Sequence, residues 1–160
     1  MIKKICLSIT TRGNYAKLKS LIDVISKDPN IELQLAIGGM AVLTKYGRIY
    51  SQLENLDCTI RKINFVIEGE NLSTMAKSSG VALLEFSTAF EELKPDIVFV
   101  IADRFECLPI AIAASYMNIP VAHIEGGEMT GSIDESIRHA ITKLSHIHFP
   151  SSNEAAERIE

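Results

Sequence analysis

The chain has 160 residues, which fits one domain, and its 47% hydrophobic and 22% charged residues are typical of a globular protein with one sizeable core. A formal net charge of −4 argues against a nucleic-acid-binding surface, and no apolar run approaches the roughly 18 residues of a membrane span. Cys6, Cys58 and Cys107 are odd in number and far apart, so we expect reduced thiols in a cytoplasmic protein.

Short β-branched apolar runs alternate with amphipathic stretches along the chain. In chain order we expect a strand at 4–10, a helix at 15–26, strands at 31–37 and 59–65, a helix at 72–93 capped by Ser73 or Asn71, a strand at 96–102, a helix at 105–117, a strand at 120–124, a helix at 134–144 and a strand at 147–149. For residues 38–55 the sequence leaves two alternatives: a helix flanked by loops, or one long active-site loop. The order predicts an α/β protein with a doubly wound, Rossmann-like parallel sheet.

Functional residues are expected where these strands end, because open parallel sheets bind ligands outside the carboxyl ends of their strands. The residues at those places are Arg12 and Gly13, Gly38 and Gly39, Asp103 and Arg104, Glu125 to Glu128, and then Asp134 and Glu135. Acidic groups, arginine and glycine therefore converge on one edge of the predicted sheet.

Arg12 and Gly13 lie in the first turn between a strand and a helix, where backbone N–H groups and a guanidinium can bind phosphate. An ordinary exposed turn explains the same residues equally well. The turn lacks the G-x-G-x-x-G pattern and the glycine-rich P-loop, so the sequence predicts neither an NAD site nor a P-loop site.

Asp103 directly follows an apolar run that does not alternate, which is typical of a strand covered on both faces. Its carboxylate is therefore shielded from water on one side and is a candidate for acid–base chemistry. Aspartate is also a favoured N-cap for the helix expected from residue 105, and the sequence leaves both roles open.

Glu125 ends a strand and is followed by Gly126 and Gly127, which permit a sharp turn and the close approach of a ligand. Packing explains a glutamate poorly at this place, although a solvated loop residue would fit. Glu125 is therefore a second acidic candidate.

Asp134 and Glu135 stand at the start of a helix, where either of them favours the helix dipole. Ser132 and Glu135 have the spacing of a capping box, in which the side chain of each residue accepts a hydrogen bond from the backbone N–H of the other. That box leaves Asp134 unexplained and makes it the third acidic candidate.

Four histidines stand in the second half of the chain: His123, His139, His146 and His148. His146 and His148 would share one face of a strand, which zinc can use, but no third ligand has metal spacing. We expect no metal site and histidines that stay neutral and form hydrogen bonds within the fold.

Several stretches carry a recognisable pattern: RGNY at 12–15, MAKS at 75–78, DRFE at 103–106, IPVAHIEGGE at 119–128, TG at 130–131 and DESIRHAITKLSH at 134–146. With these motifs the chain resembles the hydrolysing UDP-N-acetylglucosamine 2-epimerases of sialic-acid biosynthesis and their relatives that act on other UDP-2-acetamido sugars. The resemblance covers essentially the whole chain, and the stretch from 120 to 146 is its most specific part.

The resemblance implies a two-lobe fold of the glycosyltransferase-B type, in which residues 1–160 are the N-terminal lobe and a C-terminal lobe lies beyond this chain. The catalytic positions fall on Asp103, Glu125 and Asp134, and the substrate-binding positions on Arg12, Arg104, Gly126, Gly127 and Arg138. Two departures concern Ala102, where the family often has glycine, and Ala41, where it often has histidine. The second departure bears on sugar specificity or on the efficiency of catalysis.

The implied reaction eliminates UDP to leave a 2-acetamidoglycal and then adds water with inversion at C2, giving a free N-acetylmannosamine-type sugar. It needs a UDP-sugar substrate, no cofactor and no metal, and the resemblance implies a cytoplasmic homodimer or homotetramer. The isolated fragment is expected to be inactive. Three alternatives stay open, namely a non-hydrolysing 2-epimerase, a glycosyltransferase and a non-catalytic domain that binds nucleotide sugars.

Overall fold

The structure of the chain is a computed structural model that describes residues 2–47 and 49–160. Within those residues the elements are β1 (Lys3–Ile9), α1 (Arg12–Ile25), β2 (Ile31–Gly38), the 3-10 helices η1 (Gly39–Val42) and η2 (Thr44–Tyr46), α2 (Ile49–Leu53), β3 (Thr59–Ile63), α3 (Leu72–Leu93), β4 (Ile97–Ile101), α4 (Cys107–Tyr116), β5 (Val121–Ile124), α5 (Ile133–Leu144), β6 (Ile147–Phe149) and α6 (Asn153–Ile159). No helix in this part of the chain is long and apolar enough to cross a membrane.

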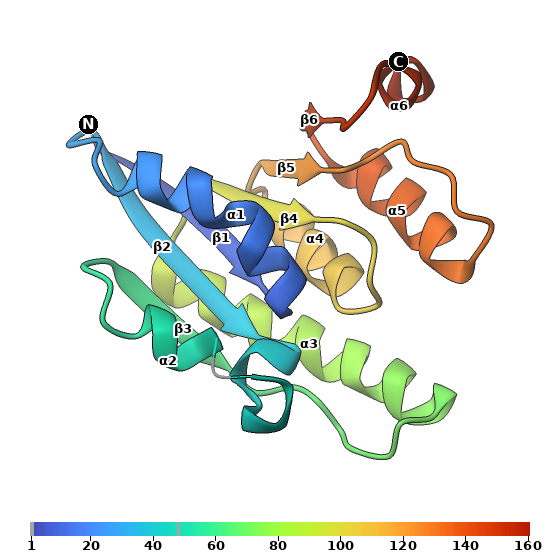
Figure 1. Cartoon of the computed structure of the whole chain (residues 1–160), viewed down its shortest axis with the longest axis horizontal. Coiled ribbons are helices and arrows are strands. Elements are labelled where there is room, and N and C mark those ends of the chain that lie inside the picture. Colours follow the sequence, from blue (N-terminus) through green and yellow to red (C-terminus); the bar gives the residue numbers. More distant parts are fainter. Residues whose placement is uncertain (1, 48) are drawn as a thin grey trace.

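The strands form one parallel sheet in the order β3-β2-β1-β4-β5-β6. The chain winds outward from β1 through β2 to β3, crosses to β4, and then winds outward the other way through β5 to β6 (Figure 1). This order confirms the predicted doubly wound, Rossmann-like α/β fold. The winding reverses between β1 and β4, and the crevice above the carboxyl ends of these two strands is where such sheets bind ligands.

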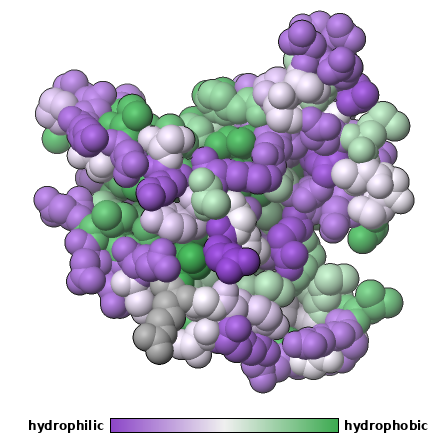
Figure 2. Space-filling view, viewed as in Figure 1, coloured by the Kyte–Doolittle hydropathy of each residue, from purple (hydrophilic) through white to green (hydrophobic). Residues whose placement is uncertain are grey.

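Helices cover both faces of the sheet because successive side chains of a strand point to opposite faces. On one face, Cys6 and Val98 pack with Phe86 of α3 in a core that also includes α4 and α5. On the other face, Leu7 packs with Leu18 of α1 in a second core. Hydrophilic residues dominate the surface seen in Figure 2, where α6 projects as a polar extension at the upper right.

Helix α1 begins three residues earlier than its apolar spacing predicts. Thr11 is its N-cap, and the Thr11 hydroxyl accepts from the Asn14 N–H at 3.1 Å while the Asn14 side chain accepts from the Thr11 N–H at 3.1 Å. This reciprocal pair satisfies two backbone donors and starts the helix at Arg12. Arg12 therefore stands at the positive end of a helix dipole.

The structure corrects two predictions about the segments between helices and strands. The helix expected from residue 105 begins at Cys107, and the Glu106 side chain at its N-cap position makes no capping hydrogen bond. The segment 38–55 forms short turns of helix, η1, η2 and α2, so it is neither a single helix nor an open loop. Arg48 lies in this segment but outside the described residues.

Of the two cap candidates for α3, the structure selects Asn71. The Asn71 side chain accepts from the Thr74 N–H at 3.0 Å, and the Thr74 hydroxyl accepts from the Asn71 N–H at 3.2 Å. Ser73 lies inside the helix, which begins at Leu72. The three cysteines are free thiols, with Cys6 and Cys107 buried in the core.

Candidate active site

The three predicted acidic residues all lie at the carboxyl edge of the sheet. Asp103 follows β4, Glu125 follows β5, and Asp134 is in the first turn of α5, which comes next in the chain. Strands β4 and β5 are paired neighbours, with Ile101 beside Ile124 in the parallel register. The fold therefore brings the acids to one edge, and within this edge each has its own surroundings.

Asp103 is held by Arg138 and does not cap a helix. The Arg138 guanidinium donates from Nη2 to Asp103 Oδ2 and from Nη1 to the Glu128 carbonyl oxygen. The Arg138 side chain is only 6% exposed, so this pair is shielded from water and salt. The expected alternative role of Asp103 as an N-cap is wrong, and Arg138 has a partner inside the protein rather than an open guanidinium.

Glu125 combines an unfavourable backbone conformation with an ion pair that the sequence did not reveal. Its φ is 64°, which a residue with a side chain adopts only when the surrounding structure enforces it. Its Oε2 lies 2.5 Å from Nζ of Lys17 on α1, and its N–H donates to the Phe149 carbonyl at 2.9 Å. The carboxylate is 28% exposed and Lys17 is 50% exposed, so this pair, unlike Asp103–Arg138, is open to solvent.

The loop before α5 is organised by Glu135, which leaves Asp134 without such a role. The Glu135 carboxylate accepts from the N–H groups of Thr130 and Gly131, both at 2.6 Å, and these bonds lower the pKa of Glu135. Ser132 occupies the N-cap position but its side chain makes no capping bond, so the predicted capping box is wrong. Asp134 instead lines a cavity, which keeps it available to a ligand.

Gly126 and Gly127 are explained by close approaches within the chain itself. A Cβ atom on Gly126 would lie 2.8 Å from Nδ1 of His123. Gly127 has φ of 83°, and a Cβ there would lie 2.2 Å from the carbonyl oxygen of Ala155 in α6. The expected close approach exists, but in this structure the neighbour is protein rather than ligand.

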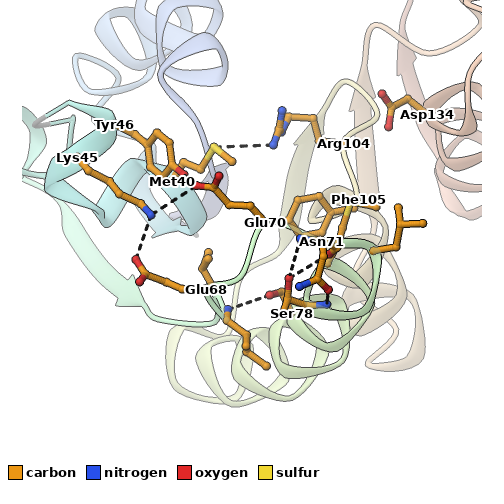
Figure 3. Close-up of a pocket in the computed structure, with 15 residues that line it drawn as sticks. Met40, Lys45, Tyr46, Glu68, Glu70, Asn71, Ser78, Arg104, Phe105 and Asp134 are labelled. Carbon is orange, nitrogen blue, oxygen red and sulfur yellow. Dashed lines mark hydrogen bonds and ion pairs between the residues drawn. The ribbon is translucent and has the colours of Figure 1, made fainter.

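A cavity of about 680 Å³ opens beside Asp134 (Figure 3). It is lined by residues of η1, η2, the β3–α3 connection, α3 and the β4–α4 loop: Met40, Lys45, Tyr46, Val66, Ile67, Glu68, Glu70, Asn71, Leu72, Thr74, Met75, Ser78, Arg104, Phe105 and Asp134. Most of its uncharged lining is apolar, which suits one face of a small ligand. Figure 3 shows Arg104 between Asp134 on one side and the cluster around Met40 on the other.

Several polar side chains of this cavity are already paired with one another. Lys45 Nζ lies 3.0 Å from Glu68 Oε1 and 3.9 Å from Glu70 Oε1, and the Tyr46 hydroxyl donates to Glu70 at 3.3 Å. The Ser78 hydroxyl accepts from a backbone N–H at 2.9 Å. Arg104 and Asp134 stand apart from these pairs.

A second cavity of about 560 Å³ adjoins the first and contains the N-terminus of α1. It is lined by Thr11, Arg12, Gly13, Met40, Lys45, Tyr46, Gly47 and Arg104. Arg12 is exposed there. The predicted residues Arg12 and Arg104 are thus brought together around one space, where free helix N–H groups and two guanidinium groups can meet an anion.

Arg104 and Lys45 both line the two cavities, but Lys45 is paired with Glu68 and Glu70, whereas Arg104 keeps open donors. Its Nε donates to Glu106 Oε1 at 2.9 Å, and Nη2 approaches the Met40 sulfur at 3.8 Å. Partial burial acts to lower the pKa of Arg104, but the Glu106 carboxylate outweighs it and the pKa lies above the ordinary value. Arg104 therefore keeps its positive charge.

The prediction of histidines that form hydrogen bonds within the fold is confirmed for His123 and His146, whereas the buried Nδ1 of His148 has no partner among the described residues. His123 is fully buried, and its Nε2 lies 2.9 Å from the Ala102 carbonyl while Nδ1 lies 3.3 Å from the Thr142 hydroxyl. Burial lowers the pKa of His123, which keeps the ring neutral as predicted. In the part of the chain that the structure describes, no three His, Cys, Asp or Glu side chains gather as metal ligands.

Comparison with known proteins places this geometry in context. The family described as UDP-N-acetylglucosamine 2-epimerase matches residues 23–160. A Campylobacter jejuni protein named GDP/UDP-N,N'-diacetylbacillosamine 2-epimerase (hydrolyzing) is 38% identical over 93% of this chain and 39% of its own length. A Legionella pneumophila protein named UDP-N,N'-diacetylbacillosamine 2-epimerase (hydrolyzing) and a Neisseria meningitidis UDP-N-acetylglucosamine 2-epimerase are each 37% identical over 99% of this chain. The chain spans about 40% of the length of these relatives.

Solved structures share the fold at lower sequence identity. A UDP-N-acetylglucosamine 2-epimerase crystal structure matches with a TM-score of 0.85 at 22% identity, covering 99% of this chain and 44% of that one. The Neisseria meningitidis UDP-GlcNAc 2-epimerase bound to UDP-GlcNAc matches with a TM-score of 0.80 at 21% identity, over 98% of this chain and 42% of that one. Acinetobacter baumannii MurG matches less closely, with a TM-score of 0.61 at 15% identity over 94% and 43% of the two chains.

Proposed function

Because this chain belongs to the UDP-N-acetylglucosamine 2-epimerase family, we propose that the complete protein is a hydrolysing epimerase. It converts UDP-N-acetylglucosamine, or a related UDP-2-acetamido sugar, to UDP and a free N-acetylmannosamine-type sugar. The observation that carries the proposal is the position of Asp103, Glu125 and Asp134 at the carboxyl edge of the sheet, where Asp134 lines a cavity together with Arg104.

The first stage of the proposed reaction is an elimination. A carboxylate removes the proton at C2 while the C1–O bond to the diphosphate breaks, so that UDP leaves with the bonding electrons and a 2-acetamidoglycal remains. The C2 proton is weakly acidic, so negative charge develops mainly on the departing diphosphate. Arg12 at the N-terminus of α1 suits the stabilisation of that charge.

The second stage adds water across the glycal double bond. A carboxylic acid returns a proton to C2 on the opposite face, and water bonds to C1 after losing its own proton to a carboxylate. Asp103, Glu125 and Asp134 share these acid and base roles. Glu125 suits a role that exchanges protons because its carboxylate and its Lys17 partner are both open to solvent, whereas Asp103 is tied to buried Arg138.

The remaining substrate-binding candidates are Arg104, Arg138, Gly126 and Gly127. Arg104 faces both cavities and suits direct contact with the substrate. Arg138 and Gly127 are engaged within the chain, so they support the site through Asp103 and α6. A second lobe, expected beyond residue 160, would enclose the nucleotide.

Two substrates are tested first, because relatives at 37–38% identity are named for N,N'-diacetylbacillosamine and for N-acetylglucosamine. The full-length protein is incubated with each UDP-sugar, and UDP and free sugar are quantified by chromatography. Equal amounts of UDP and a C2-inverted free sugar support a hydrolysing epimerase. Accumulation of UDP-N-acetylmannosamine without free UDP would instead identify the non-hydrolysing reaction, and no change in either UDP-sugar would leave only a binding domain.

We further expect a cytoplasmic homodimer or homotetramer that supplies sialic-acid-type biosynthesis. Leu84 on α3 and Tyr116 on the adjacent α4 are 69% and 85% exposed, and such apolar side chains suit burial against another copy. Light scattering coupled to size-exclusion chromatography of the full-length protein measures the oligomeric state, and a monomer at micromolar concentration would contradict this expectation.

A further inference from the structure

Arg104 occupies the junction of the two cavities and has open hydrogen-bonding capacity. It lines the first cavity together with Asp134 and the second together with Arg12. The guanidinium carries five N–H donors, and within residues 2–47 and 49–160 only Nε and one Nη2 position have partners. The Nη2 partner is a sulfur at 3.8 Å, which is a weak acceptor. One edge of the guanidinium is therefore available to an anion.

Glu106 fixes the direction of that edge. Its Oε1 accepts from Arg104 Nε at 2.9 Å, and its side chain is 1% exposed while Arg104 is 40% exposed. A buried carboxylate thus holds the inner nitrogen of a guanidinium whose outer part reaches the cavities. Because an arginine side chain otherwise rotates about all its χ angles, this bond pre-orients the charge.

Stability alone does not account for Glu106. Its second oxygen, Oε2, is buried without a hydrogen-bond partner among the residues that the structure describes. A buried carboxylate oxygen without a hydrogen-bond partner costs free energy. The retention of a carboxylate therefore points to a task other than packing.

We propose that Glu106 is a positioning residue that aims Arg104 at the diphosphate of the bound nucleotide sugar. The inference rests on the proposed function, because it takes a UDP-2-acetamido sugar as the ligand. Such a molecule carries its negative charge on the diphosphate alone, and a guanidinium binds phosphate oxygens through two parallel N–H groups.

The placement of the other charges agrees with this assignment. Arg12 and the N-terminus of α1 line the second cavity together with Arg104, so a diphosphate there meets cations from two separate segments of the chain. Asp134 lines the first cavity, where an anion would be repelled and a neutral sugar ring would not. The two cavities therefore divide the substrate at Arg104, with the diphosphate toward Arg12 and the sugar toward Asp134.

The test is a double-mutant cycle on the full-length protein, with UDP and uridine as probes in isothermal titration calorimetry. Glu106→Leu is expected to weaken UDP binding about tenfold and Arg104→Gln at least as much, because each disturbs a charge-assisted contact. Uridine, which lacks the diphosphate, is expected to bind all variants equally. In the Arg104→Gln background, Glu106→Leu is expected to have no further effect on UDP.

Unfolding measurements separate this role from a structural one. Glu106→Leu is expected to change the unfolding temperature little, because removal of the unsatisfied oxygen offsets loss of the ion pair with the partly exposed Arg104. If this variant does not fold, Glu106→Gln replaces it in the cycle, since it keeps the shape and loses the charge. Equal UDP affinity in the parent and the Glu106 variants would overturn the inference, as would an equal loss of affinity with and without Arg104.

The same measurements distinguish this inference from the proposed function. Arg104-dependent UDP binding without release of UDP from any UDP-sugar would contradict the epimerase proposal and support the positioning role. If the protein releases UDP from a UDP-sugar but its UDP affinity is the same in the parent and in the Arg104 and Glu106 variants, only the positioning role is overturned. A full-length protein that binds no UDP would contradict both.

Discussion

Ala102 and Glu125, which are neighbours in space at the carboxyl edge of the sheet, adopt left-handed backbone conformations with φ of 63° and 64°. They end the adjacent strands β4 and β5, and the Ala102 N–H donates to the Ile124 carbonyl at 2.9 Å. A side chain in this conformation costs about 1–2 kcal/mol. The glycine that the resembled family often has at the position of Ala102 would avoid this cost, whereas a glutamate at 125 has to be justified by what its carboxylate does.

Ala102→Gly is therefore expected to leave the free energy of unfolding unchanged or to raise it by up to about 1 kcal/mol, because relief of strain offsets the greater entropy of glycine in the unfolded chain. Urea denaturation measures the change. Ala76→Gly on an exposed turn of α3 is the matched control, and it is expected to lower the stability by about 1 kcal/mol. Equal losses in both variants would show that Ala102 is not strained.

Glu125→Gln in the full-length protein is expected to abolish turnover and to leave UDP binding nearly intact. The amide keeps the shape of the side chain but cannot exchange a proton, and loss of such a group lowers the rate by about 10² or more. UDP release assays and calorimetry measure the two quantities. Glu91→Gln, on the exposed face of α3, is the control and retains parental activity. A fully active Glu125→Gln protein would remove Glu125 from the mechanism.

The lowered pKa of His123 predicts that the free energy of unfolding decreases in mild acid. Because burial lowers its pKa from the usual value of 6.5, the unfolded chain takes up a proton at a higher pH than the folded chain does. Its stabilising contribution is thus complete above about pH 6.5 and falls as the pH drops toward the folded-state pKa, by at most about 2 kcal/mol at pH 5.

Denaturation at several pH values compares the parent with His123→Gln. The glutamine side chain supplies an N–H donor in place of the imidazole and does not titrate. The variant is expected to show a shallower decline between about pH 6.5 and pH 5. Burial also lowers the pKa of His148, so part of the slope remains in both proteins. Identical slopes would assign the acid sensitivity to groups other than His123.

At the scale of elements, hydrophobic spacing predicts the strands and helices well where apolar residues form the pattern. The strand at 147–149 lies where it was expected, and the strand expected at 96–102 spans 97–101. The alternation of strands with helices correctly predicted a doubly wound sheet. One error falls where polar side chains decide a boundary. Thr11 and Asn14 start α1 early, and no periodic apolar signal marks that first turn.

The sequence predicted that Asp103, Glu125 and Asp134 lie at one edge of the sheet but not which residues they contact, and their catalytic roles stay a prediction. Asp103, Glu125 and Asp134 were found because they follow strands that share an edge. Arg138 lies 35 residues from its partner Asp103 along the chain, and Lys17 lies 108 residues from Glu125. Local sequence patterns do not predict pairs at such separations. Lys17 could have been suspected from its place two turns into α1, above the same edge as Arg12.

Gly127, in the loop after β5, packs directly against the backbone of α6. Gly127→Ala is expected to destabilise the protein by several kcal/mol, about the cost of combined strain and overpacking, because the new Cβ would overlap the Ala155 carbonyl. Gly131→Ala, at φ of 70° with open space around it, isolates the conformational cost of about 1 kcal/mol. Denaturation and hydrogen exchange in α6 measure both effects, and equal losses would show that α6 moves aside freely.

At the carboxyl end of the sheet, some charged side chains are paired and others face the cavities. Lys17 and Arg138 hold two carboxylates there, while Arg12 and Arg104 face the cavities. The net charge of −4 is no obstacle to binding a diphosphate, because local cations and helix N–H groups determine the field at the site. The chain that carries this arrangement spans about 40% of the length of its relatives.

The central claim, that carboxylates at this edge exchange the C2 proton of a UDP-sugar with solvent, is tested most directly in heavy water. The full-length protein is incubated with UDP-N-acetylglucosamine or its diacetamido analogue, and the released sugar is analysed by NMR and mass spectrometry. We predict one deuterium at C2 of the inverted free sugar for each UDP released. A free sugar that keeps its original hydrogen at C2 would contradict the account.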